Sequence, residues 1–152
     1  IVGFGAAIQE AVSRMPEVLP RISALRRRLE AGVAKLPYAR LTGDPEHRLP
    51  GTASFAFECI EGESLILMLD MKGIAASTGS ACSTGSLDPS HVLMAIGLPH
   101  KIAHGSLRIT IGEQNTEEEI DYILASLEEI IGKLRYMSPV WDNDLQQPLE
   151  FH

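Results

Sequence analysis

A single cysteine in a segment of small residues is the feature of this sequence best suited to chemistry. Residues 77–86 read Ser-Thr-Gly-Ser-Ala-Cys-Ser-Thr-Gly-Ser and contain Cys82. Such a segment offers little apolar surface to bury, so we expect the Cys82 thiol to be accessible. A free thiol has a pKa of about 8.5, which leaves a small thiolate fraction at neutral pH. These features favour a reactive cysteine that does sulfur chemistry over a cysteine packed in the core.

Two further side chains could matter to such chemistry. Arg108 projects from the polar side of a predicted strand, and a guanidinium on a rigid strand can hold a carboxylate through two parallel hydrogen bonds. A solvated surface arginine fits the same pattern equally well. Cys59 aligns with Phe55 and Phe57 on the apolar side of another predicted strand, which indicates core packing. A disulfide between Cys59 and Cys82 is possible, but the sequence gives it no support.

Other short motifs are incomplete. Residues 3–8 begin like a dinucleotide-binding fingerprint but lack its third glycine and a preceding strand. Residues 79–85 lack the Gly-Lys-Ser/Thr ending of a phosphate-binding loop. The cysteines and histidines lack the close spacing typical of a zinc site. Three consecutive arginines, residues 26–28, fit a solvated helix face better than a binding patch.

Hydrophobic periodicity predicts the elements that would position these residues. Apolar residues at helical spacing predict a helix over residues 1–36, which Pro16 and Pro20 should kink or divide. Alternating apolar and polar residues predict strands over residues 52–59 and 106–111. In the second strand, Leu107, Ile109 and Ile111 would face inward, and Ser106, Arg108 and Thr110 outward.

The last helix has the strongest signal, because Thr116 and Glu119 form a capping box before an apolar repeat at steps of three and four. The other expected elements are a short strand near residues 38–41, a helix over 65–71 ended by Gly73, a candidate strand over 74–77, and a helix opened by Asp88 and Pro89 and ended by Gly97. Short strands separated by helices indicate an open-faced α/β sandwich, a mixed α+β fold.

Composition narrows the class of protein. The chain of 152 residues carries 13 lysines and arginines against 20 aspartates and glutamates, a formal net charge of −7. This acidity argues against a general nucleic-acid binder. No apolar run approaches the roughly 20 residues that a membrane span needs.

The two cysteines lie far apart and do not form a secreted disulfide framework, so we expect the protein to reside in a reducing cytoplasm. The chain starts at Ile1 and reads as part of a longer protein.

The run at residues 73–83, Gly-Ile-Ala-Ala-Ser-Thr-Gly-Ser-Ala-Cys-Ser, resembles the catalytic cysteine segment of the cysteine desulfurases. These pyridoxal-phosphate enzymes supply sulfur to iron–sulfur cluster assembly. The resemblance covers roughly residues 1–142 and is greatest to the branch that includes the nitrogen-fixation enzymes. Its other matching segments are residues 48–52, 61–63, 89–93, 105–112 and 115–121.

The resemblance implies the small C-terminal domain of an aspartate-aminotransferase-like fold, fold type I. Residues 1–36 would be the connecting helix from a missing large domain and residues 37–137 the catalytic-cysteine domain. Residues 138–152 would be a tail, part of it introduced by cloning. Cys82 would be the nucleophile and persulfide carrier, and Arg108 would bind the α-carboxylate of L-cysteine. A scaffold protein would accept the sulfur, and the intact enzyme would be a homodimer.

The resemblance also implies that the lysine anchoring pyridoxal phosphate lies outside this chain. None of the four lysines, Lys35, Lys72, Lys101 and Lys133, sits in the family's histidine-lysine motif. His100-Lys101 has the dipeptide, but its context is a loop that follows a helix. We therefore expect the isolated chain to be inactive as a desulfurase.

Two alternatives remain open from the sequence. A selenocysteine lyase or a cysteine-sulfinate desulfinase would share this architecture and differ in substrate. A non-catalytic domain could instead dock a scaffold through its helices and residues 138–143, with Trp141 as the anchor. A tail packed back on its own domain fits Trp141 equally well.

Overall fold

The computed structural model describes residues 1–78 and 89–149. Cys82 and Asp88 therefore lie outside the described residues. The elements in chain order are α1 (Val2–Val33), β1 (Ala39–Leu41), β2 (Thr52–Phe57), α2 (Gly62–Asp70), α3 (His91–Ala95), α4 (His100–Ala103), β3 (Ser106–Thr110), α5 (Glu117–Met137), β4 (Trp141–Asp142) and β5 (Gln147–Pro148). This mixed α/β fold, with its long first helix and short sheet, confirms the predicted fold class.

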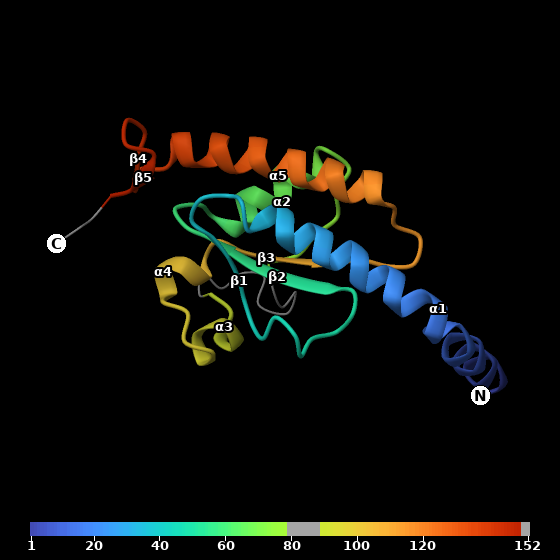
Figure 1. The fold of residues 1–152 in the computed structure, drawn as a ribbon. Helices are drawn as coiled ribbons and strands as arrows, with labels where there is room; N and C mark the ends of the chain where they lie inside the picture. The colour runs from blue at the N-terminus through green and yellow to red at the C-terminus, as the bar shows by residue number, and fades with distance from the viewer. Residues whose placement is uncertain (79–88, 150–152) are drawn as a thin grey trace.

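Three antiparallel strands in the order β1-β2-β3 form the main sheet. Helices α1, α2 and α5 cover one face, and α3 and α4 lie on the other side (Figure 1). The core lies under the three covering helices, where apolar side chains from α1, α2, α5 and the sheet meet. Its largest fully buried members include Leu29, Phe55, Phe57, Leu107, Ile120 and Leu127. Each such side chain contributes about 1.5–3 kcal/mol through its removal from water.

Helix α1 is continuous through Pro16 and Pro20, so the prolines do not divide it. Its axis changes direction toward the N-terminal end (Figure 1), as expected where prolines remove hydrogen bonds between successive turns. Only the second half of α1 reaches the core, through Ile22, Leu25 and Leu29. The first half is exposed.

Three local predictions were wrong. Residues 74–77 do not form a strand, because the Ile74 N–H is bonded to the Leu69 carbonyl in the cap of α2, and only Ser77 bridges to β3. Helix α3 begins at His91, and the described Pro89 precedes it. His100 and Lys101 lie in the single turn of α4 rather than in a loop.

Other predictions were confirmed. Helix α2 is followed by Gly73, whose φ of +75° is the left-handed conformation that favours glycine. Gly97 ends the α3 turn in the same way, with a φ of +90°. Thr116 caps α5, and its hydroxyl accepts from the Glu119 N–H in a complete capping box. None of the described helices is long and apolar enough to cross a membrane.

Candidate functional site

Arg108 lies at the centre of β3 with its side chain on the face opposite the core. Its neighbours Leu107 and Ile109 are buried, whereas Arg108 is exposed, which confirms the predicted orientation. Ser106 was expected to face outward and is instead buried. Its hydroxyl donates to the Thr78 carbonyl at 2.9 Å, which explains why a polar side chain is stable there.

Arg108 belongs to a transverse row that crosses four adjacent segments and consists of Thr42, Ser54, Arg108 and Ser77. We call these four residues the Arg108 row. Ser54 on β2 is the register partner of Arg108, and directly opposite residues place their side chains on the same face. On the other side, the Arg108 N–H donates to the Ser77 carbonyl at 2.6 Å, and the Ser77 N–H donates back at 3.1 Å. Strand β3 is therefore flanked on both sides at Arg108, by β2 on one side and by the two backbone hydrogen bonds to Ser77 on the other.

Thr42 completes the row beyond Ser54. The Thr42 N–H donates to the Ser54 carbonyl at 2.8 Å, and the Thr42 hydroxyl donates to the Ser54 hydroxyl at 2.8 Å. Hydroxyl-bearing residues thus flank Arg108 on both sides. Sequence reasoning missed Thr42 because its place depends on pairing between distant segments, and the alternation in β2 indicated only that Ser54 faces away from the core.

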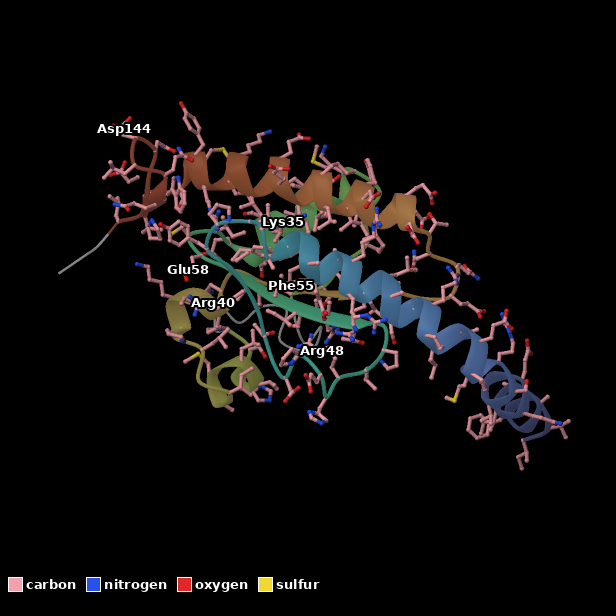
Figure 2. All side chains as sticks on the ribbon, viewed as in Figure 1. Lys35, Arg40, Arg48, Phe55, Glu58 and Asp144 are labelled. Atoms are coloured by element: carbon pink, nitrogen blue, oxygen red, sulfur yellow. The ribbon has the colours of Figure 1, made fainter. Side chains whose placement is uncertain are left out.

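The guanidinium of Arg108 has no carboxylate partner among the residues that the structure describes. Other arginines do pair: Arg14 with Glu113 and Arg28 with Asp121. Arg40 pairs with Glu58 (Figure 2). An arginine on a fixed strand that lacks an acidic neighbour can accept an external carboxylate in the bidentate geometry specific to guanidinium groups.

The segment that contains Cys82 begins next to this arginine. Thr78, the last described residue before it, follows Ser77, and its carbonyl accepts from Ser106 as described above. Cys82 follows four residues later, and four extended residues span at most about 14 Å. Chain connectivity alone therefore keeps Cys82, which lies outside the described residues, within reach of Thr78.

Cys59 is a buried structural cysteine, as predicted. Its residue is 7% exposed, and its Sγ lies 3.5 Å from the Val140 carbonyl oxygen. Burial raises the pKa of the Cys59 thiol, which keeps it protonated and unreactive at neutral pH. The strand ends at Phe57, so Cys59 lies in the following turn, with a φ of +66°, rather than on the strand.

The surroundings of the four lysines bear on whether one of them could anchor pyridoxal phosphate. Lys35, Lys101 and Lys133 are exposed, and Lys72 pairs with Glu129 at 2.7 Å. A Schiff-base lysine is normally activated by a lowered pKa, often through desolvation, which the three exposed lysines do not have, and the hydrogen bond to Glu129 raises the pKa of Lys72. Within residues 1–78 and 89–149, no group of three or more histidine, cysteine or acidic side chains could hold a metal ion.

Trp141 packs back on its own domain. Its residue is 7% exposed, its ring stands perpendicular to that of Tyr38 at 5.4 Å, and the Arg135 guanidinium lies 4.7 Å from its ring centroid. Arg135 also donates to the carbonyls of Tyr38 and Glu58. Of the two interpretations of Trp141 that the sequence allowed, the structure supports the packed tail.

The sequence matches the aminotransferase class-V family over residues 1–123, and the chain belongs to this family. Among its relatives, the cysteine desulfurase IscS of Clostridium botulinum is 52% identical over 153 residues, which cover 99% of this chain and 38% of that protein. The cysteine desulfurase NifS of Azotobacter vinelandii is 47% identical over 145 residues, or 95% of this chain and 36% of that protein. A solved NifS-like protein superimposes with a TM-score of 0.75 at 35% identity, over 88% of this chain and 33% of that structure. The chain thus spans little more than a third of these relatives.

Proposed function

We propose that the chain is the catalytic-cysteine domain of a pyridoxal-phosphate-dependent cysteine desulfurase. The observation that carries the proposal is Arg108: an exposed side chain on a paired strand, without an acidic partner among the described residues, and bonded through its backbone to Ser77, which precedes the segment that holds Cys82. Relatives named cysteine desulfurases, about half identical over nearly the whole chain, support it.

Two side chains of this chain would act on L-cysteine. Arg108 would hold its α-carboxylate and thereby orient the substrate sulfur toward Cys82. The Cys82 thiolate would attack that sulfur, so that an S–S bond forms and the substrate's carbon–sulfur bond breaks. The released electron pair remains on carbon, which takes up a proton to give L-alanine, and Cys82 retains the extra sulfur as a persulfide. A scaffold protein for iron–sulfur cluster assembly would then accept this sulfur.

The cofactor belongs, in this proposal, to the part of the whole protein outside these 152 residues. The exposure of Lys35, Lys101 and Lys133 and the ion pair of Lys72 support this placement, and the chain alone should be inactive. Residues 1–36 would connect to the large domain, residues 37–137 would form the small C-terminal domain, and residues 138–152 would be the tail. The whole enzyme would be a cytoplasmic homodimer.

The alternatives differ in measurable ways. A selenocysteine lyase would prefer selenocysteine, and a cysteine-sulfinate desulfinase would act on the sulfinate. A scaffold-docking module would bind its partner and deliver sulfur equally well after Cys82→Ser. The burial of Trp141 removes the exposed anchor on which the docking hypothesis relied.

The test uses the whole protein that contains this chain, loaded with pyridoxal phosphate and supplied with L-cysteine. We expect alanine and sulfide from the unaltered enzyme, none from Cys82→Ser, and a loss of about tenfold or more in kcat/KM from Arg108→Lys, because lysine keeps the charge but loses the bidentate geometry. Arg27→Lys is the matched control, since Arg27 is exposed on α1 and has no acidic partner among the described residues. Full turnover by the Cys82→Ser enzyme would contradict the proposal.

A further inference from the structure

A buried group of charges lies away from Arg108, between α1 and the loop that joins β1 to β2. Arg26 and Arg48 both approach the same oxygen of Glu30, at 2.6 and 3.4 Å. The three side chains are 8%, 9% and 15% exposed. We call these three residues the charge cluster. Burying three charges is costly, and apolar residues of similar size often stabilise a fold as well or better, so the cluster suggests a requirement for defined geometry.

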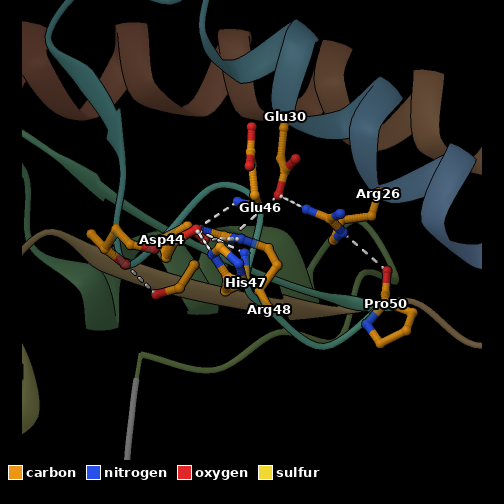
Figure 3. Close-up of polar contacts among 9 residues, drawn as sticks. Arg26, Glu30, Asp44, Glu46, His47, Arg48 and Pro50 are labelled. Carbon is orange, nitrogen blue, oxygen red and sulfur yellow. Dashed lines mark hydrogen bonds and ion pairs between the residues drawn. The ribbon is translucent and has the colours of Figure 1, made fainter.

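The remaining donors of the cluster hold both ends of the loop over residues 42–50 (Figure 3). Arg48 donates from Nη2 to the Thr42 carbonyl at 3.0 Å and from Nε to the Asp44 carbonyl at 2.7 Å. Arg26 donates from Nε to the Pro50 carbonyl at 3.0 Å. Through Glu30, the two ends of this loop are thus tied to one turn of α1.

The first end of the loop, Thr42, belongs to the Arg108 row, and the second end, Pro50, leads into β2, which carries Ser54. Thr42 is bonded to Ser54 through backbone and side chain, as described above. Gly51, which follows Pro50, accepts from the Ile111 N–H at 2.7 Å just beyond β3. This bond makes Ser54 and Arg108 a non-hydrogen-bonded pair, in which facing Cα atoms are about 4.5 Å apart and the side chains lie close together. A shift of Thr42 would therefore move Ser54, and with it the side chain that faces the aliphatic part of the Arg108 side chain.

We propose that Arg48 is a positioning residue for Arg108. Held by Glu30, Arg48 fixes Thr42, and Thr42 fixes Ser54, so that the Arg108 guanidinium is kept in the orientation that receives the substrate carboxylate. This inference rests on the proposed function, because it assigns the Arg108 side chain to that carboxylate.

The experiment measures steady-state kinetics of the whole, cofactor-loaded protein with L-cysteine. Arg48→Lys keeps the positive charge but cannot bond Thr42, Asp44 and Glu30 together. We expect the KM for L-cysteine to rise about tenfold while kcat changes less than about twofold, since a misplaced binding group weakens substrate binding. Arg28→Lys, on the same helix and paired with Asp121 instead of the loop, should leave KM unchanged.

Non-additivity separates positioning from a general structural effect. If Arg48 acts through Arg108, then Arg48→Lys should raise KM little further in an enzyme that already carries Arg108→Lys. Thr42→Val, which keeps the shape but removes the hydroxyl that bonds Ser54, should raise KM in the same direction by a smaller factor. This second variant tests the same path if Arg48→Lys folds poorly.

The outcomes are distinguishable. An active enzyme in which both Arg48→Lys and Thr42→Val leave KM unchanged would overturn the positioning role alone. Additive effects of Arg48→Lys and Arg108→Lys would overturn it as well. A whole, loaded enzyme that releases neither alanine nor sulfide from L-cysteine would overturn the proposed function, and with it this inference.

Discussion

Substitution of Gly62 by alanine tests the placement of Thr78, the last described residue before Cys82. A Cβ added at Gly62 would lie 2.7 Å from the Thr78 Cγ2 and 2.9 Å from each of the carbonyl oxygens of His104 and Ser106. Two of these contacts are with backbone oxygens, which a side-chain rotation cannot relieve. Helix α2 or the 104–106 segment must therefore shift, and such overpacking costs about 1–3 kcal/mol.

Gly132 provides the matched control within the same chain. It lies in α5, is exposed, and an added Cβ would meet nothing within 4 Å. Gly132→Ala should stabilise the chain by about 0.5–1 kcal/mol, because alanine loses less conformational entropy in a helix than glycine does. The same chemical change is thus expected to act with opposite signs at the two positions.

Urea unfolding of the 152-residue chain measures both changes, with thermal melting as a second readout. For a chain of this size, each kcal/mol corresponds to a Tm shift of about 2–4 °C, so Gly62→Ala should lower Tm and Gly132→Ala should raise it. If Gly62→Ala were neutral or stabilising, Thr78 could not lie against the first turn of α2. The close packing of Thr78 and of residues 104–106 against α2 would then be refuted.

Three further predictions concern the tail, the second cysteine and pH. Trp141→Ala should destabilise the chain by about 3 kcal/mol in urea unfolding, because the indole is buried against Arg135; a neutral result would show that the tail does not pack there. Cys59 should alkylate far more slowly in the native state than in urea, as followed by mass spectrometry, since burial raises its thiol pKa; equal rates would contradict its burial. The hydrogen bond from Arg28 lowers the pKa of Asp121, so the stability it adds is present above the unfolded aspartate pKa of about 3.9 and is lost as pH falls through the lower folded value. The stability difference between the unaltered chain and Asp121→Asn should therefore shrink on acidification, and a difference that grew would contradict this sign.

Local signals were sufficient for the elements around the site. The capping box at Thr116 and Glu119 depends on residues three apart, and the alternation through Leu107 and Ile109 depends on residues two apart. Both can therefore be seen in a short stretch of sequence. The orientation of Arg108 follows from this alternation.

Long-range contacts explain what the sequence did not show. In the sequence, Arg26 belongs to a run of three arginines that fits a solvated helix face. In the structure Arg26 is buried, and its burial is tolerated because Glu30 and the Pro50 carbonyl accept its hydrogen bonds. The neighbours Ser54 and Ser77, which flank Arg108, depend on pairing between segments up to 54 residues apart, and so does the lack of an acidic partner for Arg108 among the described residues. Sequence periodicity carries no information about such pairings.

The most direct test of the central claim is mass spectrometry of the whole, cofactor-loaded protein after exposure to L-cysteine without a reductant. Our account predicts one additional sulfur atom on the peptide that contains Cys82, none on the peptide that contains Cys59, and loss of the Cys82 adduct after treatment with dithiothreitol. Alanine should form in an amount equal to the sum of the sulfur bound to the protein and the sulfide released. An unmodified Cys82 peptide in an enzyme that nevertheless releases alanine and sulfide would contradict the assignment of Cys82 as the sulfur acceptor.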